Sequence, residues 1–526
     1  MTDLLTRYDL EKFKWKPHGS VGSPNGCVRR LGGGEQIHDI WHRHFKGLHT
    51  IFFGLVVDLH DPVSITKLTP SAQECWCSLR FQFPTIASSI GGSDELPTLT
   101  YTAETPQAIA HWAERTLLVH SPSHIDLEQL RVDESQKKVP SPDGDYCWMH
   151  LVPGELANDG TVSTFGLLLH THHSLFDGSA VKIIINFFLT QLAKALSGSR
   201  SMSESVQWGN ELENLPPAVF NILNTSEVLP IPPDSTEEPS FDNEYYKCMR
   251  SALAGLEAMN KVTIIFPSAI DTHGFKDRPK NMEWPKTRRA EVLFTREESA
   301  RILAEAKTSG FTLTHVAHAA LAMVVVADNP PNSESASHYL SNFCIVNSRD
   351  RLTSNWSLYP GYAIRGASIR IPNSAFLSLD GIMLPLDKEV LLKVAKIANS
   401  QYRAYMELPS GLGHDAQLGE ICASAIVQSG YNTKLPGDRC YSFVSDGKGE
   451  RYLNPTFMAD TGETVLSVEK FFLSVNTYDA DPIFRVSSWA GIIDIGADYN
   501  TNIVKADDMM NYLNQWKTFM LLILFD

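Results

Sequence analysis

One stretch of the chain, residues 162–196, constrains its fold more than any other. It begins as an apolar, extended run over 162–169, becomes polar, and then passes through Asp177 and Gly178 into a segment whose apolar residues recur with helical spacing. This order predicts a strand, a turn and an amphipathic helix. A side chain at such a corner gains rigidity from the strand and access from the turn, so the corner is the leading candidate for a functional site.

The length of the chain favours two domains. Its 526 residues exceed the size at which one hydrophobic core stops growing, and the Pro-, Ser- and Glu-rich segment after residue 197 has the composition of a linker. We therefore expect an N-terminal domain over 1–215, a crossover linker over 216–242 and a C-terminal domain over 243–526. Helix-rich and strand-rich segments alternate in both halves, which predicts an α/β fold with a mainly mixed β-sheet flanked by helices in each domain.

Charge and hydropathy exclude several classes of protein. The net charge of -15 argues against nucleic acid as a partner, because phosphate neutralisation needs clustered Lys and Arg. The N-terminal segment, with Glu11, Lys12 and Lys14, has no apolar core of signal-peptide length, and no run approaches the ~20 apolar residues of a membrane span. We expect a cytoplasmic monomer without a membrane span, whose eight irregularly spaced cysteines are reduced.

The paired cysteines at 75 and 77 are predicted to be packing residues. Thr69 and Pro70 have the chemistry of a helix start, with Thr as the N-cap and Pro at the first helical position. On the helix that follows, Cys75 and Cys77 are two residues apart, so their side chains point about 200° apart. They cannot share a metal ion.

Three histidines, at 170, 172 and 173, end the strand. Alternation along a strand places His170 and His172 on one face and His173 on the other, so the three cannot converge on a metal, and we expect none. A general base fits better, because an imidazole with a reference pKa of about 6.5 is largely neutral at physiological pH. No Gly-x-Ser-x-Gly motif lies nearby. Direct attack by a bound acceptor is therefore favoured over a covalent enzyme intermediate.

Three local motifs carry a family resemblance. Residues 172–178 read His-His-Ser-Leu-Phe-Asp-Gly, which matches the His-His-x-x-x-Asp-Gly motif of the CoA-dependent acyltransferases that include chloramphenicol acetyltransferase, the plant BAHD enzymes and peptide-synthetase condensation domains. Asn-Ser-Arg-Asp-Arg-Leu at 347–352, followed by Tyr-Pro-Gly-Tyr at 359–362, is similar to a BAHD signature, and Phe-Val-Ser-Asp-Gly at 443–447 resembles the strand end that closes these sites. From about residue 29 to 524 the chain resembles fungal trichothecene O-acetyltransferases, most closely the 15-O type.

The resemblance implies two chloramphenicol-acetyltransferase-like domains with an active-site tunnel between them. By position, it implies that His173 is the general base and that Asp177 is structural and pairs with Arg349. It also implies that Gly178 allows close backbone approach and that Ser445 donates a hydrogen bond to the oxyanion. It further implies acetyl-CoA as co-substrate, no permanently bound cofactor, and a small apolar acceptor in mycotoxin biosynthesis, the C-15 hydroxyl of a trichothecene. The Asp-Phe-Gly-Trp-Gly motif of plant BAHD enzymes is absent, so plant-type details of the CoA site do not carry over.

The donor site is less constrained. The basic stretch 276–289 stands out in an acidic chain, and Lys286, Arg288 and Arg289 are expected to help hold the CoA phosphates; a solvated loop is the alternative. Three other functions stay open. The first is a condensation-type acyltransferase whose donor is bound to a carrier protein, although nothing in the chain resembles an attached carrier domain. The second is an acyltransferase with a different alcohol acceptor, and the third is a non-catalytic binding protein on the same fold.

Overall fold

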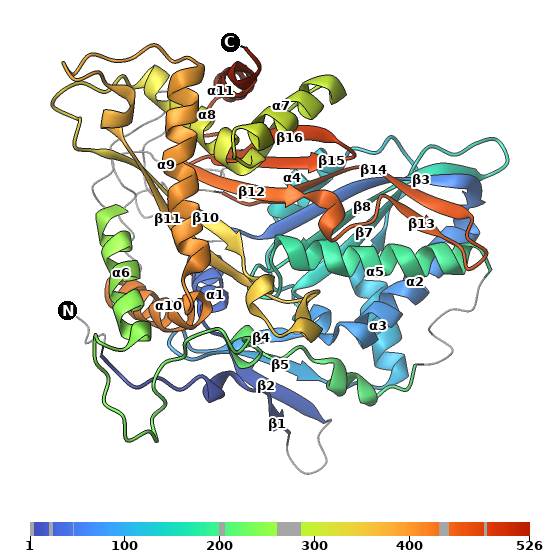
Figure 1. Cartoon of the computed structure of the whole chain (residues 1–526). Coiled ribbons are helices and arrows are strands. Elements are labelled where there is room, and N and C mark those ends of the chain that lie inside the picture. The colour runs from blue at the N-terminus through green and yellow to red at the C-terminus, as the bar shows by residue number, and fades with distance from the viewer. Residues whose placement is uncertain are drawn as a thin grey trace.

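The computed structural model describes residues 5–19, 25–45, 47–198, 206–259, 286–430, 441–477 and 481–525. Within these residues it is an α/β protein in which helices flank mixed sheets (Figure 1), as the sequence predicts. The helices that cover the sheets are α1 (Gly34–His44), α2 (Ile65–Gln82), α3 (Pro106–Thr116), α4 (Leu127–Ser135), α5 (Gly178–Leu196), α6 (Glu244–Met259), α7 (Arg296–Thr308), α8 (Leu313–Asp328), α9 (Lys388–Glu407), α10 (Gly411–Gln428) and α11 (Ala506–Leu521).

Two larger sheets form the framework. The first has six strands in the order β13 (Thr456–Met458), β14 (Thr464–Val475), β3 (Ile51–Ser64), β8 (Thr161–Thr171), β7 (Cys147–Pro153) and β6 (Leu117–Val119). The second has four, in the order β12 (Ser442–Lys448), β15 (Ile483–Trp489), β16 (Ile492–Asn500) and β9 (Thr287–Leu293). Smaller sheets are formed by β10 (Tyr339–Asn347) with β11 (Ile364–Pro372), and by β1 (Lys16–His18), β2 (Gly26–Arg30), β5 (Pro97–Thr102) and β4 (Ser89–Gly92).

Each large sheet has its own hydrophobic core. One core packs α2 and α5 against a face of the first sheet, with Trp76, Phe165 and Phe188 fully buried in it. The other packs α8, α9 and α11 around the second sheet, where Trp516 and Phe443 are fully buried. Two cores of this size agree with the expectation that 526 residues do not fold around a single one.

The second half of the chain contributes two strands to the first sheet. Strands β13 and β14 belong to residues 456–475, in the second half, yet β14 pairs antiparallel with β3 from Val475 opposite Ile51 to Leu466 opposite Leu59. The segment 216–242, expected to be a linker, is irregular but packed, since Val219 and Phe220 are buried. A boundary at 216–242 therefore does not separate two complete sheets.

The predicted strand, turn and helix at 162–196 are present. Strand β8 ends at Thr171, residues 173–175 form a turn, and α5 begins at Gly178. Helix α5 is long and apolar enough to cross a membrane by length and composition alone, and the bent pair α7 and α8 passes the same test together. However, 61% of the apolar window of α5 is buried inside the protein, as expected of a core helix.

The predicted start of α2 is wrong by about one turn. The helix begins at Ile65 after Ser64, and Pro70 lies inside it. Leu68, in the extra turn, is fully buried in the first core, so tertiary packing overrides the Thr-Pro start signal. Cys75 is buried in that core and Cys77 packs against it, as expected of packing residues. The cysteines of the described part of the chain are free; Cys440 lies outside it.

Candidate active site

A cavity of about 670 Å³ lies where the two halves meet, within the ~300–1,000 Å³ typical of small-molecule sites. Its wall combines α1, the turn after β8 and the start of α5 with residues of β11, α10, β12 and β15. Trp41, Phe343 and Ile345 give it apolar surface, and His173 reaches it from the predicted corner. The cavity therefore occupies the place where the resemblance implies a tunnel.

His173 is held in the cavity wall by the turn and by ring packing. Its imidazole stacks on that of His38, with ring centroids 3.8 Å apart and an angle of 9° between the planes. Burial lowers its pKa to about 4, and the nearby Arg485 guanidinium acts in the same direction. Backbone groups of His173 and Phe176 lie near the ring and oppose this shift, but Nδ1 makes no hydrogen bond within the described residues. A neutral imidazole in this position can accept a proton.

Two further histidines share the cavity wall, and the motif gives no sign of them. His38 lies on α1 and His49 just before β3, with their ring centroids 5.5 Å apart, and Trp41 packs edge-on against both. Burial lowers the pKa of His49 to about 3 and that of His38 well below its usual range. His173 thus sits among imidazoles that are neutral at physiological pH. Because these residues lie more than a hundred positions before His173, no local pattern could have revealed them.

His172 points elsewhere. Its ring lies 4.1 Å from that of His42, and its Nδ1 accepts a hydrogen bond from the backbone N–H of Ser174 at 3.1 Å. It does not line the cavity. His38 and His42 are four residues apart on α1, so one face of this helix supports both motif histidines. The two rings diverge because of the turn after Thr171, not because of strand alternation.

Asp177 forms the pair with Arg349 that the resemblance implies. Its carboxylate accepts two hydrogen bonds from the guanidinium, at 2.9 and 3.0 Å, and both side chains are buried. It also accepts the backbone N–H groups of Ser179 and Ala180, at 2.9 and 2.8 Å, as the N-cap of α5. A further bond, 2.8 Å from the N–H of Ala363, ties it to the second half of the chain. The carboxylate is therefore used for structure.

Arg349 uses its remaining N–H groups on the two later motifs. Its Nε donates to the carbonyl of Tyr359 at 2.9 Å, and Nη2 donates to the carbonyl of Gly361 at 2.8 Å. Nη1 reaches Asn347 Oδ1 at 3.3 Å. The segments 172–178, 347–352 and 359–362 thus form one hydrogen-bonded assembly around Asp177.

Gly178 and Ser445 both line the cavity. A Cβ on Gly178 would lie 2.5 Å from Cδ2 of Leu473, so the end of the Leu473 side chain would have to move to admit a larger residue. Ser445 lies on β12, and its Oγ is 2.8 Å from Oγ1 of Thr314. A serine hydroxyl there can donate one hydrogen bond into the cavity.

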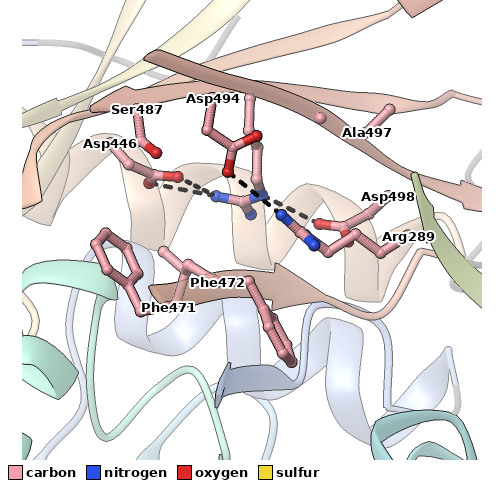
Figure 2. A pocket seen from close by; sticks show the side chains of 11 residues that line it. Arg289, Asp446, Phe471, Phe472, Ser487, Asp494, Ala497 and Asp498 are labelled. Carbon is pink, nitrogen blue, oxygen red and sulfur yellow. Dashed lines mark hydrogen bonds and ion pairs between the residues drawn. The ribbon is translucent and has the colours of Figure 1, made fainter. Parts of the chain in front are cut away.

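The three cations expected to bind phosphate, Lys286, Arg288 and Arg289, do not line the cavity. Arg289 is mostly buried beside Glu291 and Asp494. It lines a small pocket (Figure 2) that shares Asp446, Leu473 and Arg485 with the cavity wall. Arg288 donates to the side chain of Gln129 at 3.4 Å. Arg289 is thus already paired with two carboxylates, and residues 276–285 of the basic stretch lie outside the described residues.

Two ionisable side chains of the cavity wall were not predicted. Asp415, on α10, lines the cavity, and burial raises its pKa to about 8. Its Oδ2 has no hydrogen-bond partner within the described residues. Arg365, on β11, lies in the same wall and opposes that shift. A carboxyl that is mostly protonated at neutral pH can donate a hydrogen bond to a ligand oxygen.

The family and the curated relatives that this chain matches are all acetyltransferases. The family described as 15-O-acetyltransferase Tri3 matches residues 10–371. Trichothecene 15-O-acetyltransferase TRI3 of Fusarium sporotrichioides is 24% identical over 97% of this chain and 96% of its own length. Trichothecene O-acetyltransferase TRI3 of Trichoderma arundinaceum is 22% identical, covering 98% of each.

Solved structures show the same fold. The structure of the Fusarium sporotrichioides TRI3 enzyme superposes with a TM-score of 0.81 at 19% identity, over 99% of this chain and 100% of that one. The first condensation domain of the calcium-dependent antibiotic synthetase superposes with a TM-score of 0.56 at 12% identity, over 97% of each chain. The expected chloramphenicol-acetyltransferase-like fold is thereby confirmed.

The Asp177–Arg349 pair predicts non-additive effects on stability. Asp177→Asn leaves a buried guanidinium without its counter-charge, which costs about 3 to 5 kcal/mol for a fully buried pair. Adding Arg349→Met removes that orphaned charge, so the double variant should lose less stability than the sum of the two single variants. Denaturant unfolding of the wild type, the two single variants and the double variant measures the four free energies of unfolding. Strictly additive losses would mean that the two side chains do not depend on each other.

Proposed function

The chain belongs to the 15-O-acetyltransferase Tri3 family, and is thus an acyltransferase; from this premise we propose that it transfers the acetyl group of acetyl-CoA to a hydroxyl group of a trichothecene, the C-15 hydroxyl. The names of both curated relatives support a trichothecene acceptor. The observation that carries the mechanism is His173, a neutral imidazole fixed in the wall of the cavity between the two halves.

In the proposed mechanism His173 is the general base. Its Nε2 takes the proton of the acceptor hydroxyl as that oxygen attacks the thioester carbonyl carbon, because Nδ1 is buried. The tetrahedral intermediate places negative charge on the former carbonyl oxygen, and Ser445 Oγ donates a hydrogen bond to it. Collapse then breaks the carbon–sulfur bond, and the imidazolium returns the proton to the CoA thiolate.

The low pKa of His173 favours the second proton transfer over the first. At pH 7 an imidazole with a pKa of about 4 is almost entirely in the neutral form that accepts a proton. Once protonated it is a strong acid, whereas a thiol has a pKa of about 8.5. Proton return to the leaving thiolate is therefore strongly favoured. The cost is a weaker base in the first transfer, which the fixed position of the ring offsets.

Other residues of the cavity suit the two substrates. Trp41, Phe343 and Ile345 offer apolar surface to a terpenoid ring system, and Asp415, when protonated, can donate a hydrogen bond to one of its oxygens. Lys448 and Arg451 also line the cavity and are better placed for the CoA phosphates than Lys286, Arg288 and Arg289.

Thiol release tests the reaction and its substrates together. Purified protein is mixed with acetyl-CoA and a panel of alcohols that includes trichothecenes with a free C-15 hydroxyl and the matching C-15 acetates. We expect free CoA thiol only with an acceptor whose C-15 hydroxyl is free. Release with the C-15 acetate would overturn the regiochemistry. Transfer only from an acyl carrier protein would favour the condensation-type alternative.

Replacing each of the two motif histidines by alanine distinguishes a catalytic role from a packing role. His173→Ala should lower kcat by about 10²- to 10⁴-fold, the usual contribution of a positioned base, with little change in the Kd of either substrate. His172→Ala, which removes a ring outside the cavity, should be much milder. Steady-state kinetics measures kcat of both variants, and equilibrium binding measures their substrate Kd values. Equal losses of kcat in the two variants would mean that His173 is not the base or that the mechanism is wrong.

The pH profile follows from the pKa of His173. Burial lowers this pKa to about 4, so the base form is already complete well below neutrality. Therefore kcat/KM should stay level from pH 7 to about pH 5 and fall only as the pH approaches 4. Far-UV circular dichroism at each pH, as a control, detects acid unfolding. An acid limb of kcat/KM centred near 6.5 in the folded protein would contradict this expectation, because it would show that the ring is solvated in the free enzyme.

A further inference from the structure

A second cluster of ionisable groups lies outside the cavity, on the face of the first sheet covered by α4. Glu134 of α4, His150 of β7 and His170 of β8 are all buried, and each offers one ligand atom within 4.8 Å of the other two. Because Trp148 pairs with His170 across the two strands, His150 is the diagonal neighbour of His170 on the same face. None of the three residues lines the cavity.

The hydrogen bonding of His150 points to a missing partner. This side chain is 0% exposed, and its Nε2 makes no hydrogen bond within the described residues. The nearest carboxylate oxygen, Oε2 of Glu134, is 3.8 Å away, beyond hydrogen-bond distance. A buried polar atom without a partner is costly and rare in folded proteins.

The other ring nitrogen of His150 is already held. His150 Nδ1 lies 3.1 Å from Nε2 of His120. If Nδ1–H donates to His120, the lone pair of His150 is left on Nε2, facing Glu134 and His170. Histidines that bind metals are oriented in this way, by a hydrogen bond from the second ring nitrogen.

The ion pair of Glu134 with a lysine does not supply the missing partner of His150 Nε2. The carboxylate pairs with Lys137 at 2.7 Å, but this contact uses Oε1, and the Lys137 side chain is 61% exposed. Oε2 is left toward the two imidazoles. The ion pair with Lys137 therefore explains one oxygen of Glu134 and leaves His150 Nε2 without a partner.

We propose that Glu134, His150 and His170 bind one Zn²⁺ or a similar divalent transition-metal ion, with His120 orienting His150. Two imidazole nitrogens and one carboxylate oxygen are a common zinc donor set, whereas Ca²⁺ and Mg²⁺ prefer oxygen ligands alone. Metal–ligand distances of about 2.0–2.2 Å require donor atoms roughly 3.3 Å apart in a tetrahedron. The 3.8 Å between Glu134 and His150 is within a small side-chain movement of this value.

The position of the site gives the ion a structural role. It would join the covering helix α4 to two neighbouring strands, and His170 lies two residues before the motif histidine His172. Helix α4 also reaches the second sheet, since Arg131 donates to the backbone carbonyl of Thr287 at 2.8 Å. The bound ion would thus stabilise the strand that carries the catalytic corner without entering the reaction.

Metal binding by the full-length protein tests the proposal. The chelator-treated protein is titrated with Zn²⁺ by calorimetry and with Co²⁺ by visible absorption. We expect one ion per chain, a rise in Tm on Zn²⁺ addition, and no thiolate-to-cobalt charge-transfer band. Glu134→Gln and His150→Gln should abolish this binding, and His120→Gln should weaken it by about 10- to 100-fold. The matched control is His111→Gln, which removes an exposed histidine of α3.

Three results would overturn the site. One is the absence of stoichiometric binding at micromolar Zn²⁺. Another is binding that Glu134→Gln leaves unchanged, and the third is a thiolate band, which would place the ion on cysteines. If His150→Gln fails to fold, Glu134→Gln decides the question, because it keeps the shape of the side chain and removes only the charged ligand.

Discussion

The carboxylate of Asp177 and the guanidinium of Arg349 are the contact on which the arrangement of the site depends. Asp177 caps the helix that follows the turn at 173–175, and Arg349 holds the backbone carbonyls of Tyr359 and Gly361 in the other half of the chain. Both side chains are buried, so neither charge can turn to solvent if its partner is lost. The pair therefore fixes the position of the turn, and with it His173, relative to the opposite wall of the cavity.

Burial is the second constraint, because it sets the protonation state of the cavity. His38, His49 and His173 lie close together and are kept neutral by desolvation, while the same effect keeps Asp415 mostly protonated at neutral pH. The cavity wall therefore holds a proton acceptor and a proton donor at the same pH, beside fixed charges such as those of Lys448, Arg451 and Arg485.

Features that depend on neighbouring residues or on a short motif could be predicted from the sequence. The strand, turn and helix at 162–196 could be read from periodicity, and the partnership of Asp177 with Arg349 from a family resemblance. Contacts between distant segments could not be read. The pairing of β14 with β3 and the packing of His38 on His173 join residues far apart in the chain. The surroundings of Arg289 could be read only in part, since Glu291 is its neighbour in the sequence but Asp494 reaches it only through the fold.

The most direct measurement is a crystal structure of the protein with a non-transferable acetyl-CoA analogue and a trichothecene that carries a free C-15 hydroxyl. If His173 is the general base, this hydroxyl oxygen should lie about 2.6–3.2 Å from Nε2 of His173 and face the acyl carbonyl carbon. A hydroxyl held instead by His38 or His49, with His173 out of reach of both ligands, would contradict it.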